Sequence, residues 1–101
     1  MDNRLLSLLG IARRAGKLCL GSDAVQETAL KGGCPLILFA SDLSPRTART
    51  VLAAAAKGNV ETATLRENMD EIGCAIGKRT GVIAVNDKGF AKKLLALNAE
   101  D

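Results

Sequence analysis

The sequence predicts an α/β fold, a three-layer α/β/α sandwich around a small mixed four-stranded sheet. Short apolar runs at residues 35–40 and 82–85 are continuous rather than alternating, so both faces of each strand are expected to be buried. Segments with helical spacing alternate with these runs, which places helices on both faces of the sheet. The length of 101 residues suits one domain, and we expect residues 1–101 to form it without a linker or repeat.

The first half of the chain is expected to form two helix–strand pairs. A helix is predicted over residues 3–15 and ended by Gly16, and a short strand follows at 18–20. Ser22 is a plausible N-cap for a second helix over 23–31, which two glycines end. The apolar run at 35–40 is the clearest strand in the chain.

The second half continues the alternation. A cap followed by proline, Ser44-Pro45, starts a helix that runs to Lys57, and a weaker strand covers 60–65. A helix over 67–76 ends at Gly77, and a buried strand follows at 82–85. Asn86 and Asp87 are placed to cap a last helix that extends through Leu97.

The sequence lacks most of the residue patterns that catalysis or metal binding requires. The chain has no histidine, which excludes Ser-His-Asp and Cys-His mechanisms, and it has neither a C-x-x-C pair nor a phosphate-binding glycine loop. Asp70 and Glu71 are adjacent, and adjacent residues diverge on a helix, so we expect them to be solvated. The sequence therefore predicts no enzyme, no metal and no cofactor; a deep polar cleft near Asp42 or Asp87 would favour an enzyme instead.

The cysteines and the apolar segments indicate where the protein works. Cys19, Cys34 and Cys74 each lie among apolar neighbours, which is typical of core residues in a reducing compartment. The first residues lack a signal-peptide pattern, and no stretch approaches the roughly 18 apolar residues of a membrane span. We expect a soluble, cytoplasmic protein without membrane contact. A sandwich covered on both faces needs no partner subunit, so we expect a monomer.

Charge and loop chemistry permit nucleic acid as a partner. The chain has 14 Lys and Arg against 11 Asp and Glu, a formal charge of +3. The segment 21–23 flows into a helix start, where open N–H groups favour a phosphate. The loop 77–81 carries two cations and a hydroxyl between glycines, although its chemistry alone slightly favours an ordinary solvated loop. Two other basic groups suit a solubilising surface: Arg13, Arg14 and Lys17 at the end of the first helix, and Lys88, Lys92 and Lys93 on the last.

Four segments that together cover almost the whole chain carry a family likeness: LLGIARRAGKLCLGSDAV, LILFASDLSPRT, EIGCAIGK and IAVNDKGFAKKL. The last two, in this order and at this spacing, are the most specific. With them the sequence resembles the ribosomal L-seven-Ae family of kink-turn RNA binders, and most closely its YlxQ-like bacterial branch. The resemblance implies an α/β/α sandwich that binds RNA through the segment at 21–23 and the loop before the last strand.

The site that the resemblance implies is altered here. Well-understood members have a glycine, a hydroxyl residue, asparagine and glutamate, with a lysine three residues on. Gly21 and Ser22 match, but Asp23, Ala24 and Glu27 replace the last three, and losing a good base contact costs roughly 1–3 kcal/mol. The loop before the last strand is usually apolar in the kink-turn binders of the family, but here it is cationic. This difference suggests contacts through its backbone and a looser dependence on RNA sequence. The expected RNA-binding residues are Lys17, Gly21, Ser22, Asp23, Lys31, Lys78, Arg79, Thr80 and Gly81.

The sequence therefore favours a ribosome-associated protein that binds structured RNA, kink-turn-like or related, with ribosomal RNA as the expected partner. The alternative is a protein-interaction module that keeps the fold and has lost specific RNA binding. The substitutions at 23, 24 and 27 keep that alternative open.

Overall fold

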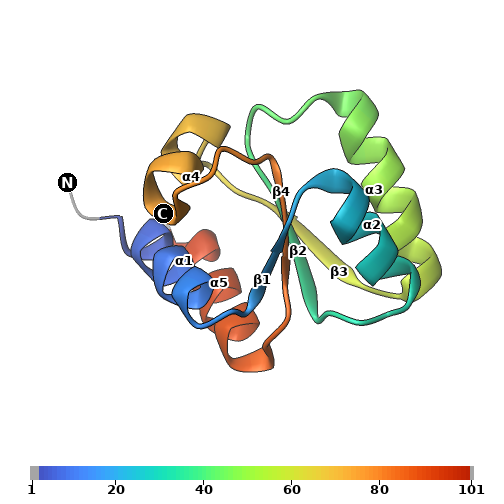
Figure 1. The fold of residues 1–101 in the computed structure, drawn as a ribbon, viewed down its shortest axis with the longest axis horizontal. Helices are drawn as coiled ribbons and strands as arrows, with labels where there is room; N and C mark the ends of the chain where they lie inside the picture. Colours follow the sequence, from blue (N-terminus) through green and yellow to red (C-terminus); the bar gives the residue numbers. More distant parts are fainter. Residues whose placement is uncertain (1–2, 101) are drawn as a thin grey trace.

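The computed structural model describes residues 3–100, which form five helices around one four-stranded sheet (Figure 1). Helices and strands alternate strictly along the chain, as the sequence pattern predicts. The elements in chain order are α1 (Arg4–Arg14), β1 (Leu18–Leu20), α2 (Ser22–Leu30), β2 (Leu36–Phe39), α3 (Pro45–Gly58), β3 (Glu61–Thr64), α4 (Met69–Ile76), β4 (Val82–Val85) and α5 (Lys88–Ala99).

The sheet is mixed and has the strand order β1-β4-β2-β3. β4 pairs antiparallel with β1 on one side and with β2 on the other, and β3 joins the far side of β2 in parallel. β1, β2 and β3 therefore end at one edge of the sheet, where β4 begins. We call this the loop edge, and the opposite one, where β4 ends, the basal edge.

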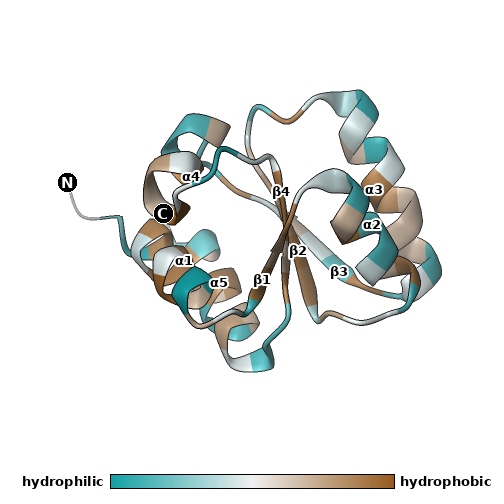
Figure 2. Cartoon of the chain, viewed as in Figure 1, coloured by the Kyte–Doolittle hydropathy of each residue, from teal (hydrophilic) through white to brown (hydrophobic). Residues whose placement is uncertain are grey.

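Helices cover both faces of the sheet, which confirms the α/β/α sandwich. α1, α4 and α5 lie on one face, and α2 and α3 lie side by side on the other (Figure 1). The central strands feed both cores: Leu36 and Leu38 of β2 enter the first, while Ile37 and Phe39 enter the second. All residues of β2 and β4 are buried, and the ribbon is accordingly most apolar at the sheet (Figure 2). The continuous apolar runs therefore indicated the two central strands correctly.

Two predicted helix starts are wrong by one or two residues. The N-cap of α2 is Gly21 and not Ser22, because Gly21 adopts φ 95° and turns the chain directly into the helix. α4 begins at Met69 rather than at residue 67, because Asn68 forms a capping box with Glu71. Both differences move the ends of loops that meet at the loop edge.

A close approach of α2 and α3 fixes the spacing of that helix layer. A Cβ added to Gly58 would lie 1.7 Å from the carbonyl oxygen of Ala29, so only glycine allows the two backbones to meet there. The contact lies at the last turns of both helices, near the basal edge. Among residues 3–100, no helix has the length and apolar character needed to cross a membrane.

The cysteine prediction is partly wrong. Cys34 is buried and Cys19 is half-buried, but Cys74 is exposed on α4, because it lies on the side of the helix away from buried Ile72 and Ile76. Burial raises the pKa of the Cys34 thiol above its usual 9.0.

Candidate nucleic-acid interface

The two loops singled out in the sequence lie next to each other at the loop edge. Antiparallel pairing places Leu20 at the end of β1 opposite Ile83 near the start of β4. The chain stays paired past the strand, because the Gly21 N–H donates to the carbonyl oxygen of Val82 at 3.1 Å. The loop after β2 joins them, since the Ala40 N–H donates to the carbonyl oxygen of Gly81 at 2.9 Å. Backbone hydrogen bonds thus join segments that are far apart in sequence along the loop edge.

The N-terminus of α2 differs from the other helix starts among residues 3–100. The other four helices each have an N-cap side chain that accepts a hydrogen bond from the first turn: Asn3, Ser44, Asn68 and Asp87. Gly21 has no side chain to do so, and no side-chain cap replaces it. The backbone N–H groups at the start of α2 are therefore open to an outside acceptor, and the helix dipole favours an anion there.

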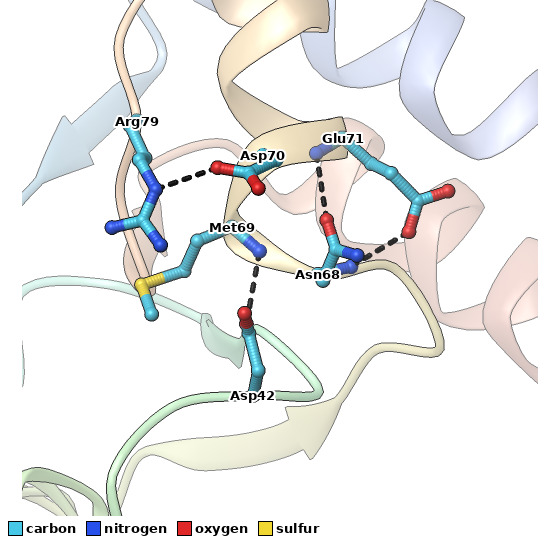
Figure 3. Close-up of polar contacts among 6 residues, drawn as sticks. All are labelled: Asp42, Asn68, Met69, Asp70, Glu71 and Arg79. Carbon is cyan, nitrogen blue, oxygen red and sulfur yellow. Dashed lines mark hydrogen bonds and ion pairs between the residues drawn. The ribbon is translucent and has the colours of Figure 1, made fainter.

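The two cations of the loop 77–81 differ in their contacts. Arg79 is held against α4: its Nε donates to Oδ1 of Asp70 at 2.7 Å (Figure 3). The hydrogen bond and the charge of Asp70 raise the pKa of Arg79 above its usual value. Lys78 is exposed and forms no ion pair with any residue in 3–100. Lys78 is thus the loop cation that is available to a phosphate.

Thr80 and Gly81 hold the loop in place and do not face solvent. The Thr80 side chain is buried, and its hydroxyl donates to the carbonyl oxygen of Val82 at 3.1 Å. A Cβ on Gly81 would come within 2.7 Å of Leu43 and 3.0 Å of Met69. Of the four residues expected to bind RNA from this loop, these two are placed to shape it.

Asp42 connects the loop after β2 to the start of α4. Its Oδ1 accepts from the Met69 N–H at 2.9 Å, beside the capping box of Asn68 and Glu71 (Figure 3). Asp87 caps α5 by accepting from the Phe90 N–H at 2.9 Å. Both carboxylates that an enzyme would have used are therefore engaged in capping helices. The role of Asp42 has no local signal in the sequence, because its partner is 27 residues away.

Lys17 and Lys31 lie at the basal edge, away from the other expected site residues. Lys17 precedes β1, and its carbonyl oxygen accepts from the Asn86 N–H, just past the end of β4. Lys31 follows the last turn of α2, and its Nζ lies 3.4 Å from Oε1 of Glu27. The structure therefore brings together residues 21–23 and 78–81, and it separates these two lysines from them.

Two shallow grooves flank the exposed side of α1. One lies between α1 and α5, with Arg4, Leu8, Lys93 and Glu100 among its lining residues; the other lies between α1 and α4. Ile11, which is 48% exposed, lines both.

Comparison with known proteins decides the family. Residues 3–95 match the ribosomal protein L7Ae/L30e/S12e/Gadd45 family. The chain belongs to this family. The family is not one of enzymes, as the sequence analysis expects. The RNA-binding protein YlxQ of Bacillus subtilis is 36% identical over 91 residues, which cover 89% of this chain and 90% of that protein. YlxQ of Enterococcus faecium is 31% identical over 90 residues, covering 89% of this chain and 86% of that protein.

Solved structures agree with this membership of the L7Ae family. A Bacillus halodurans protein described as having unknown function has a TM-score of 0.90 and 34% identity, with 98% of this chain and 100% of that one covered. A Giardia lamblia 15.5 kD RNA-binding protein has a TM-score of 0.70 at 16% identity, with 96% and 87% covered, which shows the shared fold.

Proposed function

We propose that this chain binds structured RNA through the loop edge, and that it works in association with the ribosome. The observation that carries the proposal is the open N-terminus of α2 beside the exposed Lys78, in a chain whose YlxQ relatives are named RNA-binding proteins. Backbone N–H groups and a helix dipole bind a phosphate without reading a base. Such a site recognises the path of an RNA backbone. A bent or kinked RNA has a path that a plain duplex does not have.

The chemistry of α2 favours shape recognition over base recognition. Asp23 accepts hydrogen bonds but does not donate them, and Ala24 offers no polar group. Glu27 is paired with Lys31 and directs a negative charge to the surface of α2. Contacts to bases therefore contribute less than backbone contacts, and the target is a kink-turn or a related sharply bent RNA whose two backbones reach both loops.

The proposal is tested by replacing the two loop cations one at a time and measuring RNA affinity at several salt concentrations. Lys78→Ala should weaken binding and reduce the slope of log affinity against log salt by about 0.7–0.9, the effect of one phosphate contact. Arg79→Ala should change the slope less, because Arg79 is already bound to Asp70. If neither Lys78→Ala nor a variant that combines Lys78→Ala with Arg79→Ala alters affinity or slope, the loop is not an RNA contact and the proposal fails.

Association with the ribosome is tested separately. We expect the native chain to sediment with ribosomal particles at low salt and to be released as salt is raised. If the chain is found only in the ribosome-free fractions at every salt concentration, that part of the proposal is contradicted, and direct RNA binding is then tested by the titration alone.

One observation favours a second candidate, a protein-interaction module. Ile11 is 48% exposed between two grooves on the side of α1, which is the kind of surface a helix or loop of another protein covers. Ile11→Asp separates the candidates: it should leave RNA affinity unchanged if the loop edge binds RNA. Loss of RNA binding in a folded Ile11→Asp protein would show that the loop edge is not the site.

A further inference from the structure

The basal edge brings together four cations from two distant parts of the sequence, which we call the basal patch: Arg13, Lys17, Lys88 and Lys92. The end of α1 turns tightly, since the Lys17 N–H donates to the carbonyl oxygen of Ala12 at 3.0 Å, which keeps Lys17 beside Arg13. The Asn86 N–H then donates to the carbonyl oxygen of Lys17 at 2.8 Å, which places the start of α5 next to both.

α5 continues the row away from that junction. Lys88 is the first residue of the helix, and Lys92 follows four residues later on the same face, about 6 Å further along the axis. All four side chains of the basal patch are exposed. In Figure 1 the end of α1, the start of β1 and the start of α5 meet at the lower side of the sheet.

The other cations of these helices have different surroundings. Arg14 lines the groove between α1 and α4 together with Glu71, and Lys93 lines the groove between α1 and α5 together with Glu100. They are therefore not part of the basal patch.

No residue in 3–100 compensates the charge of the basal patch. The ion pairs among these residues involve other side chains. The adjacent carboxylate, Asp87, accepts from the Phe90 N–H and serves as the cap of α5. Lys88 also stands at the positive end of the α5 dipole, where a cation is disfavoured, and no acidic residue lies in the first turn. Arg13 alone is favoured by a helix dipole, since it lies in the last turn of α1. The three lysines gain no ion pair from the described residues, so the gathering of these cations points to an anionic partner.

The loop edge carries charges of both signs, and its exposed cations include Lys78 and Arg46. Arg79 is bound to Asp70, and Arg66 donates to the main-chain carbonyl oxygens of Leu97 and Glu100 at the end of α5. Asp23 and Asp42 add negative charge at the same edge. The loop edge therefore contributes shape, open N–H groups and mixed charge, while the four unpaired cations of the basal patch lie at the opposite edge of the sheet.

We propose that the basal patch is a second RNA-binding surface, which holds the phosphate backbone of an RNA helix other than the segment at the loop edge. The choice of RNA rests on the proposed function; the location of the patch does not. A row of lysines and arginine binds phosphates and reads no sequence, and the neighbouring Phe90 packs against the core. This surface therefore provides most of the salt-dependent affinity. One protein molecule then bridges two RNA segments on opposite edges of its sheet.

The test uses a plain RNA duplex, the full chain and two double variants of equal charge. Lys17→Ala with Lys88→Ala removes two cations of the basal patch, and Arg49→Ala with Lys57→Ala removes two exposed cations of α3 as a control. The basal double variant should reduce the salt slope for the duplex by about 1.8, that is 0.9 for each phosphate contact. The control should change it by less than half as much.

The outcomes separate this inference from the proposed function. Equal losses in the two double variants would mean a diffuse charge effect and would overturn the basal patch as a site. An unchanged duplex slope in a basal variant that still prefers bent RNA would also overturn it, while the loop-edge function stands. Failure of the native chain to bind the duplex even at low salt would overturn it as well. Thermal unfolding is measured for both double variants to check that they are folded.

Discussion

The ion pair between Asp70 and Arg79 gives the sharpest prediction, because it keeps one of the two loop cations away from RNA. Asp70→Asn removes the negative charge while preserving the size of the side chain. Both partners are well exposed, 78% and 59%, so the pair contributes little to folding and its loss should leave thermal stability nearly unchanged. The released guanidinium can then contact a phosphate.

The magnitude follows from counterion release. One additional phosphate contact steepens the salt slope by about 0.9 for duplex RNA, so a fourfold reduction in salt should increase affinity about 3.5-fold more in the variant than in the native chain. The assay is a fluorescence titration of a kink-turn RNA at four salt concentrations. The effect should disappear when Arg79→Ala is combined with Asp70→Asn.

Glu71→Gln provides the matched control. Glu71 is exposed, carries the same charge one residue away, and accepts from the Asn68 N–H at 3.0 Å through an oxygen that glutamine retains. This variant removes one negative charge without releasing Arg79. If Glu71→Gln steepens the salt slope as much as Asp70→Asn, the gain comes from net charge alone and the reasoning is refuted.

Four further predictions concern the scaffold and its cysteines. Gly58→Ala should destabilise the fold by about 1–3 kcal/mol in urea unfolding, because its Cβ would meet a backbone carbonyl at 1.7 Å. Gly33→Ala is the control and should cost less, since the nearest contact of its Cβ would be at 3.4 Å. Equal losses of stability in the two variants would contradict the close approach of α2 and α3. Asn68→Ala should lower stability by about 1 kcal/mol in thermal unfolding through loss of the α4 cap, and no change would count against the capping box. Because burial raises the pKa of Cys34, the unfolded chain releases that proton first as pH rises, so stability should fall above about pH 9 and Cys34→Ala should reduce the fall. Exposed Cys74 should react with iodoacetamide before Cys34 does, as mass spectrometry will show.

Local patterns predicted the fold well. The continuous apolar runs at 35–40 and 82–85 contain the two central strands, and Ser44-Pro45 and Gly77 mark helix ends as their residue types suggest. These signals succeed because buried strands and helix caps depend on a few consecutive residues. The start of α4 was predicted two residues too early, because Asn68 caps the helix and the helical pattern alone does not show this.

The site was less predictable, because it depends on contacts between distant segments. Nothing local indicates that Asp70 binds Arg79 or that the Thr80 hydroxyl turns inward to its own backbone. The placement of Lys17 required the direction of β1 in the sheet, since a residue before a strand and one after it lie at opposite edges. The sequence indicated the two loops, and the strand register showed that they lie next to each other and which cations accompany them.

The most direct test of RNA binding at the loop edge is a titration of the native chain with a kink-turn RNA and with a plain duplex of the same length, each at two salt concentrations. We predict binding to both RNAs that weakens with salt, and a preference for the kink-turn RNA that persists at the higher concentration, because shape recognition at the loop edge does not depend on counterion release alone. Equal affinity for both RNAs would contradict shape recognition by the loop edge. Absence of binding to either RNA at low salt would contradict RNA binding itself.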